Sequence, residues 1–329
     1  MAAAATLPSI NGAACVHALA PHASCHACVS ACPQGAWLLD EDGLSLDTSR
    51  CDGCGLCIPA CPRAALSLSR PLTILRDHAG NGTAFAACDR APHAGIAAMP
   101  CLHALGRRDL DHLADDAVQG LIVLSGPCES CARGKTASNL PAAARLHASL
   151  RSSHDLPTVR IVAHDAATFG RRLRRAKEDS ETVNGARRRL LAPFLPHPVP
   201  TEVCSAEAPL VAIAPRISPE RCVACDACAG ICPDGALILR AGATPAYVVT
   251  PPACSGCGLC VDVCDQQAIT LHSPAHAAQS TLELDPCRCA ACGAAYHAVA
   301  GFPRNGGGLC RICIRTQHHR KLFQVFTPT

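Results

Sequence analysis

The sequence is poor in aromatic residues and long apolar runs, and it carries little excess charge. Phe, Trp and Tyr make up 3% of the 329 residues, which argues against a large aromatic-rich core. No segment approaches the roughly 18 apolar residues of a membrane-spanning helix, so we expect no direct membrane insertion. The net charge of +3 is too small to indicate a nucleic-acid partner. The first residues lack the basic and apolar regions of a secretory signal, and we expect a cytoplasmic protein.

Cysteine is the residue in excess, with 26 copies. A disulfide framework is typical of short secreted chains, whereas cysteines two residues apart in an intracellular chain favour metal binding. Metal sites also supply folding energy that a small core cannot. The spacing of the cysteines therefore decides what they do.

Four stretches carry the spacing Cys-x2-Cys-x2-Cys-x3-Cys or a variant of it. CDGCGLCIPACP at 51–62 and CVACDACAGICP at 222–233 match it in full and end in Cys-Pro. In CSGCGLCVDVCD at 254–265, Asp265 replaces the proline. In the stretch at 15–33 the first gap has nine residues instead of two, which makes Cys15 the least secure ligand. Three cysteines at this pitch can wrap a loop around one cluster, and the fourth leaves that loop.

These motifs resemble those of the bacterial two-cluster [4Fe-4S] ferredoxin family. The resemblance implies two ferredoxin modules, at 1–70 and 204–283, with four [4Fe-4S] clusters. In that family the fourth cysteine ligates the other cluster, which implies crossed ligand sets. The implied sets are Cys15, Cys25, Cys28 and Cys61; Cys51, Cys54, Cys57 and Cys32; Cys222, Cys225, Cys228 and Cys264; and Cys254, Cys257, Cys260 and Cys232.

Residues 71–170 alternate short apolar strands with helical segments. Strands are predicted at GTAFAAC, GIAAMPC, GLIVLSGPCESC and TVRIVAH, and helices at RRDLDHLADDAVQ and LPAAARLHASLRSS. This alternation predicts a small α/β domain with a parallel sheet, where the loops at the carboxyl ends of the strands converge. Those ends carry Cys88, Cys101, Cys128 and Cys131, so we predict one metal site there. The alternative is a set of ordinary buried or redox cysteines.

The PCLHAL and GLIVLSGPCESC stretches also resemble the delta subunit of methyl-viologen-reducing hydrogenase. That subunit passes electrons between a hydrogenase and a flavin-containing reductase through an iron–sulfur cluster. The resemblance implies a similar role for the middle domain. This sequence lacks the family's longer gap between the final pair of cysteines, which leaves [2Fe-2S], [4Fe-4S] and zinc open as the metal.

Residues 171–203 are basic and rich in proline, and a linker is predicted there. Arg171, Arg174 and Arg175 share a helical face, which is either a solvated surface or a docking surface for an acidic redox partner.

The tail at 284–329 resembles a zinc ribbon. Its two Cys-x2-Cys pairs are separated by 17 residues, and they comprise Cys289, Cys292, Cys310 and Cys313. Four thiolates at this spacing suit structural zinc; a rubredoxin-like iron site or another cluster is the alternative. Cys204 and Cys287 remain, and Cys287 could replace Cys289 in the ribbon.

The sequence thus predicts an α+β multidomain protein in which two ferredoxin modules flank a small α/β domain, with the ribbon at the end. No catalytic constellation or dinucleotide fingerprint accompanies the metal motifs. We therefore expect an electron carrier rather than an enzyme, which relays single electrons to or from an oxidoreductase partner. The alternative is a ferredoxin-type assembly or maturation factor for a molybdenum- or nickel-containing oxidoreductase.

Overall fold

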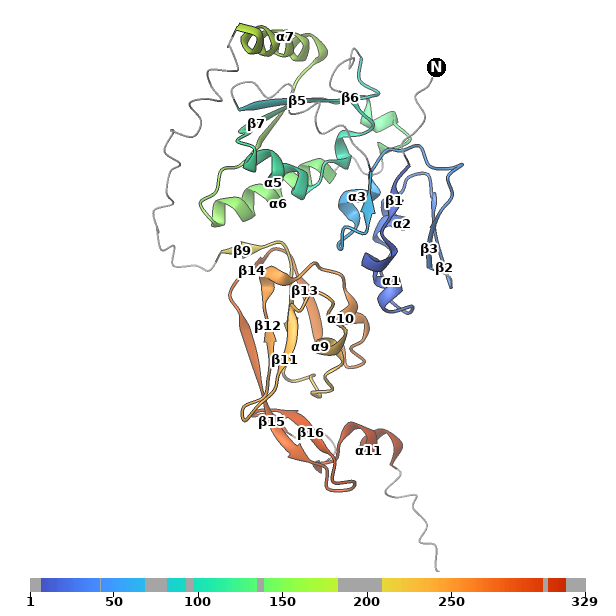
Figure 1. Cartoon of the computed structure of the whole chain (residues 1–329), viewed down its shortest axis with the longest axis vertical. Coiled ribbons are helices and arrows are strands. Elements are labelled where there is room, and N and C mark those ends of the chain that lie inside the picture. The colour runs from blue at the N-terminus through green and yellow to red at the C-terminus, as the bar shows by residue number, and fades with distance from the viewer. Residues whose placement is uncertain are drawn as a thin grey trace, which may run out of the picture. The chain divides into compact units, whose positions relative to one another are not determined.

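The computed structural model describes residues 7–41, 43–68, 82–92, 98–134, 139–182, 209–303 and 307–317 (Figure 1). The chain divides into two compact units: residues 1–21 and 25–208 form the first, and residues 22–24 and 209–329 form the second. No disulfide joins the cysteines of the described ranges. None of the helices that the structure describes has the length and apolar character needed to cross a membrane.

The first unit begins with a small module of two antiparallel strand pairs and short helices. Strand β1 pairs with β4, and β2 pairs with β3. The elements are β1 (Ser9–Ile10), η1 (Gly12–Ala14), α1 (Val16–Leu19), α2 (Ala27–Ala31), β2 (Trp37–Asp40), β3 (Gly43–Leu46), α3 (Cys57–Ala60) and β4 (Leu66–Ser67). Trp37, Cys57 and Leu66 form its buried core, and both aliphatic side chains and further cysteines pack against them. The cysteines are therefore part of the small core of this module.

The rest of the first unit is an α/β domain with a four-stranded sheet of order β6-β5-β7-β8. All three strand pairings are parallel, which confirms the parallel sheet that the sequence predicts. Helices α5 and α6 cover one face and α7 the other (Figure 1). The elements are β5 (Thr83–Cys88), β6 (Ala98–Met99), η2 (Leu102–Ala104), α5 (Arg107–Asp115), β7 (Gly120–Leu124), η3 (Cys128–Ser130), α6 (Asn139–Ser153), β8 (Arg160–Ala163) and α7 (Ala166–Thr182).

The two-sided cover explains why the central strands are apolar without alternation. Residues 84–88 of β5 and 121–124 of β7 are all buried, as expected for parallel strands with helices on both faces. Phe85 of β5 meets Phe169 of α7 edge to face, with ring centroids 5.8 Å apart. Phe169 and Leu173 belong to the domain core. Helix α7 therefore continues the domain past residue 170, where the sequence analysis began a linker.

A buried histidine joins α5 to α6. His147 is fully buried; its Nδ1 lies 2.8 Å from Asp111 Oδ1, and its Nε2 accepts a hydrogen bond of 3.0 Å from the Val159 amide. Since Nε2 accepts, the ring proton sits on Nδ1 and is donated to the carboxylate. Burial opposes the charge on Asp111, but His147 and Arg107 outweigh it and lower the pKa of Asp111. Both ring nitrogens are thus satisfied, as a buried histidine requires.

The second unit repeats the architecture of the first module. Strand β10 pairs with β13 and β11 pairs with β12, and the connecting helices lie in the same order along the chain. The elements are β10 (Ala214–Ile217), α9 (Ala227–Ile231), β11 (Leu237–Arg240), β12 (Ala246–Val249), η6 (Pro251–Ala253), α10 (Leu259–Asp262) and β13 (Ile269–His272). The repeat of the sequence motifs is therefore also a repeat of the fold.

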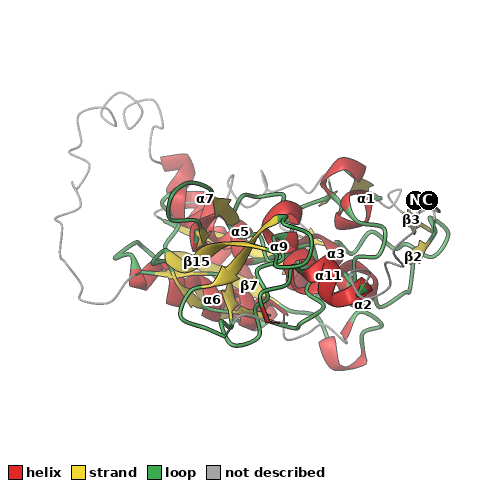
Figure 2. Cartoon of the chain, turned by 90° about the horizontal axis from the view of Figure 1, so that it is seen from below, coloured by secondary structure: helices red, strands yellow, loops and turns green. Residues whose placement is uncertain are grey.

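One long strand joins this module to the tail. Strand β15 pairs with β12 through residues 280–283 and with β16 through residues 284–288. The predicted boundary between residues 283 and 284 falls inside β15, so the tail is a continuation of the module's sheet. Loops connect many short elements (Figure 2). The remaining elements are β9 (Leu210–Val211), β14 (Ala275–His276), β15 (Ser280–Arg288), β16 (Ala295–Val299) and α11 (Arg311–Thr316).

Candidate metal centres

The loops between the ferredoxin-type cysteines contain residues in the left-handed backbone conformation. Gly53 and Gly55 flank Cys54 at φ values of 68° and 76°. At the same positions within the motif at 222–233, Ala224 and Asp226 adopt φ values of 50° and 64°. Residues with a Cβ rarely take this conformation, so the loop accepts strain in order to curl its cysteines around one point.

In the first module the structure brings together cysteines from both motifs. Burial raises the pKa of the Cys28 thiol to about 12, and the thiols of Cys25 and Cys61 add to the shift. Burial also raises the pKa of Cys57 to about 11, and its thiol neighbours are Cys32 and Cys51. The fourth cysteine of each motif thus lies beside the cysteines of the other motif.

Residues on either side of Cys15 contact the neighbourhood of the first of these groups. Cys15 precedes α1 and is partly exposed. Its neighbour Ala14 accepts a hydrogen bond of 2.9 Å from Arg63 Nε, two residues after Cys61. His17 Nε2 lies 2.8 Å from the Cys25 carbonyl oxygen. The segment around Cys15 is therefore held near Cys25 and the turn that follows Cys61, despite the long gap before Cys25.

The second unit groups its thiols in the same crossed manner. Burial raises the pKa of Cys228 to about 12, with contributions from Cys225, Cys222 and Cys264. Burial likewise raises the pKa of Cys260 to about 12, and the contributing thiols are Cys257, Cys254, Cys232 and Cys228. Two groups of four thiols from two motifs each therefore meet in this unit.

In three of the motifs, a backbone amide donates a hydrogen bond to the sulfur of the motif's fourth cysteine. The amide four residues later donates to Cys32 at 3.3 Å, to Cys61 at 3.2 Å and to Cys264 at 3.2 Å. The turn after the fourth cysteine creates this contact. Hydrogen bonds to thiolate sulfur favour the more negative, reduced state of an iron–sulfur cluster, so these amides would raise its reduction potential.

The middle-domain cysteines meet at the point where the strand order of the sheet reverses. From β5 the chain moves to β6 on one side, and from β7 it moves to β8 on the other. The loops after β5 and β7 therefore diverge, which creates a crevice at the carboxyl end of the sheet. One cavity there is lined by Cys88, Cys101, Cys128 and Cys131. The structure thus brings the four predicted cysteines together.

Two residues that the sequence analysis missed line the same cavity, His103 and Arg133. The Leu140 amide donates to His103 Nδ1 at 3.4 Å, so the ring proton lies on Nε2, which faces Cys128 Sγ at 3.7 Å. Burial lowers the pKa of His103, which favours this neutral form. In the sequence, the one feature that could have indicated these two residues is their position, because each lies two residues after a cysteine.

Gly134 fixes the loop that carries Cys128 and Cys131. Its amide donates to the Cys131 carbonyl at 2.8 Å. A Cβ at residue 134 would stand 2.1 Å from the carbonyl oxygen of Cys128, far inside contact distance. The loop therefore closes on itself only with glycine at this position.

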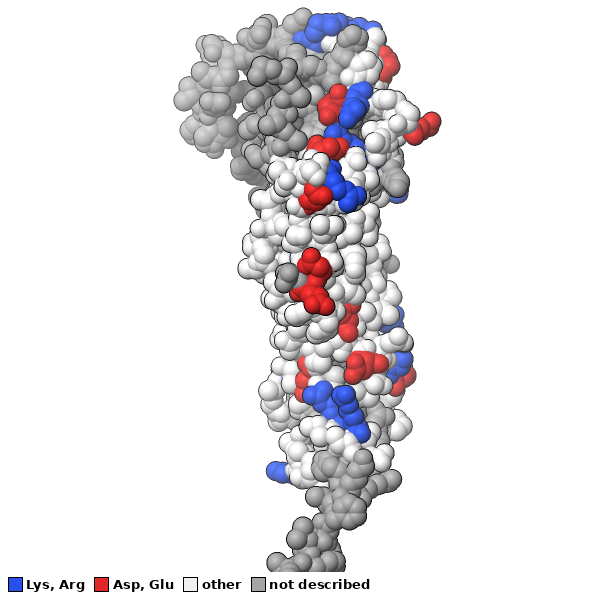
Figure 3. Space-filling model, turned by 90° about the vertical axis from the view of Figure 1, so that its right-hand side faces the viewer, with Lys and Arg blue, Asp and Glu red and all other residues white. Residues whose placement is uncertain are grey.

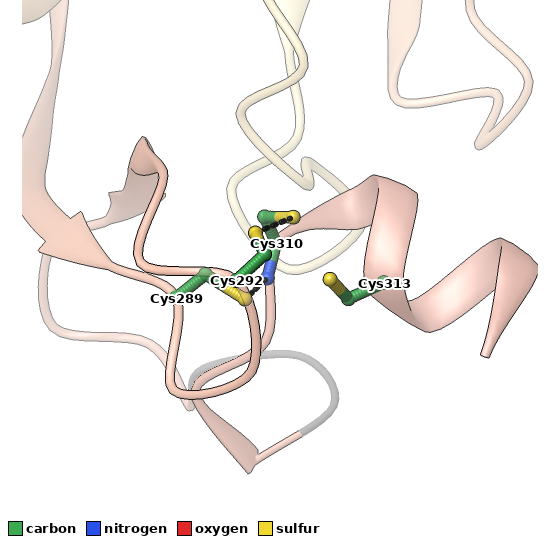
Figure 4. Close-up of side chains that lie close together, drawn as sticks. All are labelled: Cys289, Cys292, Cys310 and Cys313. Atoms are coloured by element: carbon green, nitrogen blue, oxygen red, sulfur yellow. Dashed lines mark hydrogen bonds between the residues drawn. The ribbon is translucent and has the colours of Figure 1, made fainter. Parts of the chain in front are cut away.

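The tail holds a compact quartet of thiols. Cys289, Cys292, Cys310 and Cys313 offer sulfur atoms that all lie within 4.8 Å of one another (Figure 4). Cys289 and Cys292 come from the loop after β15, and Cys310 and Cys313 from the start of α11. The Cys292 and Cys310 sulfurs are 3.7 Å apart. One tetrahedral ion with metal–sulfur bonds of about 2.3 Å places its sulfurs about 3.8 Å apart, so the quartet fits a single ion.

A hydrogen bond in the tail favours the thiolate form of Cys289, which is the form that binds a metal cation. The Cys310 amide donates to Cys289 Sγ at 3.2 Å and lowers the pKa of Cys289 to about 6. Burial and the neighbouring thiols raise the pKa of Cys313. Cys287 is not in the quartet; its thiol donates to the Asp285 carbonyl at 3.5 Å. Cys204 lies outside the described residues.

Two family models match the chain. A 4Fe-4S dicluster domain matches residues 23–65, and a 4Fe-4S binding domain matches residues 215–238. The first match contains seven of the eight cysteines of the first module and begins after Cys15. A comparison with curated proteins finds no match. The chain therefore contains two ferredoxin-type 4Fe-4S domains, which are typical of iron–sulfur electron carriers.

Proposed function

We propose that this chain is an iron–sulfur electron-transfer protein with four [4Fe-4S] clusters in its two ferredoxin modules. The observation that carries the proposal is the crossed grouping of thiols in both modules. One cavity is lined by Cys222, Cys225, Cys228 and Cys264, and another by Cys51, Cys54, Cys57 and Cys32, although each set comes from two different motifs. The matched 4Fe-4S domains support the same assignment. Such clusters, when bound, supply one-electron transfer; the protein supplies the thiolates, the amide hydrogen bonds and the apolar cover.

The middle site is proposed to hold a further iron–sulfur cluster rather than zinc. Among the residues that the structure describes, the tail quartet is the group of thiols whose sulfur atoms all lie within 4.8 Å of one another, close enough to bind one ion. The sulfur atoms of the four ferredoxin groups and of the middle quartet do not meet this distance limit. Four thiolates on different irons stand further apart than four on a single ion, so the wider middle quartet suits a cluster.

The tail is proposed to hold structural zinc. Its sulfur spacing fits a single tetrahedral ion, and closed four-cysteine sites of this kind have no open coordination position. Zinc has no accessible redox change, so the tail would stabilise the protein without carrying electrons.

A redox protein with an acidic surface is the proposed partner. Arg171, Arg174 and Arg175 are exposed on α7, and Leu173 anchors the opposite side of that helix. On the face drawn in Figure 3, acidic and basic side chains are interspersed over a largely uncharged surface. A small basic patch on one helix steers an acidic partner without the extended positive field that nucleic acid requires. Charge reversal at the three arginines is expected to slow association and flatten its salt dependence.

Anaerobic purification with iron and sulfide analysis and a redox titration tests the proposal. The four ferredoxin clusters account for about sixteen irons, and each cluster accepts one electron in the titration. A chain that holds far fewer, and that instead binds tightly to a metal-free oxidoreductase, would contradict the carrier function and indicate a maturation factor.

A further inference from the structure

The middle site and one ferredoxin site share a buried interface within the first unit. Cys54 and Cys101 belong to one buried cluster together with Leu56 and Ala104, and both thiols are less than one-tenth exposed. At the same interface Gly106 faces Pro59 of α3, where a Cβ on Gly106 would stand 2.5 Å from the Pro59 Cβ. Ligands of two different centres are thus packed together without room for solvent between the domains.

One arginine connects the surroundings of both sites. Arg133 is 6% exposed, and its Nε donates to Asp52 Oδ2 at 2.7 Å. Its Nη1 donates to both carboxylate oxygens of Asp89 at 3.3 Å and to the Pro100 carbonyl. Its backbone amide donates to Cys131 Sγ at 3.4 Å.

Each partner of this guanidinium is next to a cysteine. Asp52 lies between Cys51 and Cys54 in the chain and accepts the Cys54 amide at 3.2 Å through Oδ1. Asp89 follows Cys88, whose thiol lies 3.8 Å from Asp89 Oδ1, and Pro100 precedes Cys101. One cation therefore touches the ligand loops of the ferredoxin motif at 51–57 and of the middle quartet.

The geometry points to an electron-transfer pair formed by the middle site and the cluster on Cys51, Cys54 and Cys57, with Arg133 as the positioning residue that the two share. This inference rests on the proposed function and adds the internal route. One electron leaves the reduced centre and enters the oxidised one, and no bond forms or breaks. Its source is a reduced iron–sulfur or flavin protein that docks on this chain, and the next acceptor is the rest of the ferredoxin module.

The positive charge of Arg133 affects the reduction potentials of both centres. Reduction adds one negative charge to a centre, and a nearby buried cation stabilises that added charge. A guanidinium stays protonated in proteins, and Arg133 is also paired with Asp52 at 2.7 Å and with Asp89 at 3.3 Å. It therefore raises the reduction potentials of both centres together and holds the two loops at a fixed separation.

The first experiment assigns the signals in the holoprotein with its full chain. The double variant C128A/C131A is expected to lose one reducible centre in an EPR-monitored redox titration, together with the spin–spin splitting that this centre causes in one ferredoxin cluster. If no reducible centre is lost, the middle site is not a redox site and the pair is wrong, although the four ferredoxin clusters of the proposed function remain. If the centre is lost but no splitting changes, the two sites are not neighbours in function.

The second experiment compares two arginines of the same cavity. R133M is expected to lower the midpoint potentials of both centres, because both lose a cation. R90M removes the same charge from an exposed side chain that lies 3.7 Å from Asp89 and is expected to shift the middle centre alone. A shift of only one centre in R133M, with both centres still loaded, refutes the shared bridge and leaves the proposed function intact.

Variant R133K is a control for misfolding of R133M, which leaves Asp52 without its cation and Asp89 with Arg90 alone. Lysine keeps the charge but lacks the planar fork that reaches Asp52 and Asp89 at once. Its potentials are expected to stay near those of the parent while the spin–spin splitting weakens. Unchanged splitting in R133K would show that the fork does not set the separation of the two centres.

Discussion

Substitution of Gly134 by alanine tests how closely the loop of the middle site is built. The added Cβ would stand 2.1 Å from the Cys128 carbonyl oxygen, whereas ordinary contact begins at 3.4 Å. The carbonyl, or the turn that carries it, must therefore move by about 1.3 Å. A binding site tolerates displacements of about 0.5 Å in its ligands, so the thiols of Cys128 and Cys131 would leave their binding geometry. We expect metal affinity at the middle site to fall about tenfold or more.

The assay is metal content and absorption spectrum after anaerobic reconstitution of the full chain with limiting iron and sulfide. G120A is the matched control, because its Cβ would meet its nearest neighbour, Thr83 Oγ1, at 4.0 Å. Far-UV circular dichroism shows whether both variants fold. If folded G134A binds as much metal as G120A at the same iron concentration, the closure of this loop does not position the cysteines, and the reasoning is refuted.

Four further outcomes follow from the contacts described. C61S is expected to lose the cluster at Cys28, about four irons, and to keep the cluster of its own loop; Mössbauer spectra showing the reverse would refute crossed ligation. C292S is expected to lose one tail ion and no iron, measured by elemental analysis. H147L is expected to lower the free energy of unfolding by about 2–4 kcal/mol in urea titrations, because the buried Val159 amide and the partly buried Asp111 carboxylate lose their partner. Because the pKa of Asp111 is lowered by the fold, its contribution is present above the ordinary carboxyl value and is lost as pH falls through the lowered one; D111N should therefore flatten the acid limb of stability.

Cysteine spacing and strand–helix alternation were sufficient to predict much of the architecture. The strand at GTAFAAC ends at Cys88 as predicted, and the sheet is parallel. The pattern is informative here because parallel strands covered on both faces must be apolar throughout. The crossed thiol groups follow from a local motif that closes one loop and sends its last cysteine away from it.

The connections between parts could not be predicted from local patterns. Helix α7 continues past residue 170 because Phe169 and Leu173 pack on the sheet, and arginine-rich sequence conceals that buried side. The link from Arg133 to Asp52 joins residues 81 positions apart. Local spacing carries no information on such a pair, because the contact depends on how two folded domains meet.

The position of the tail quartet shows what a bound metal would stabilise. Strand β16 pairs with β15 beyond the part of β15 that β12 supports, so the end of the sheet has two strands among those described. A two-stranded hairpin is only marginally stable in water. The quartet joins the end of β15 to α11, and its buried members Cys289, Cys310 and Cys313 form the core of this region. A metal bound at that point would contribute folding free energy where neither a third strand nor an apolar core can, which is the physical argument for the structural role proposed for the tail.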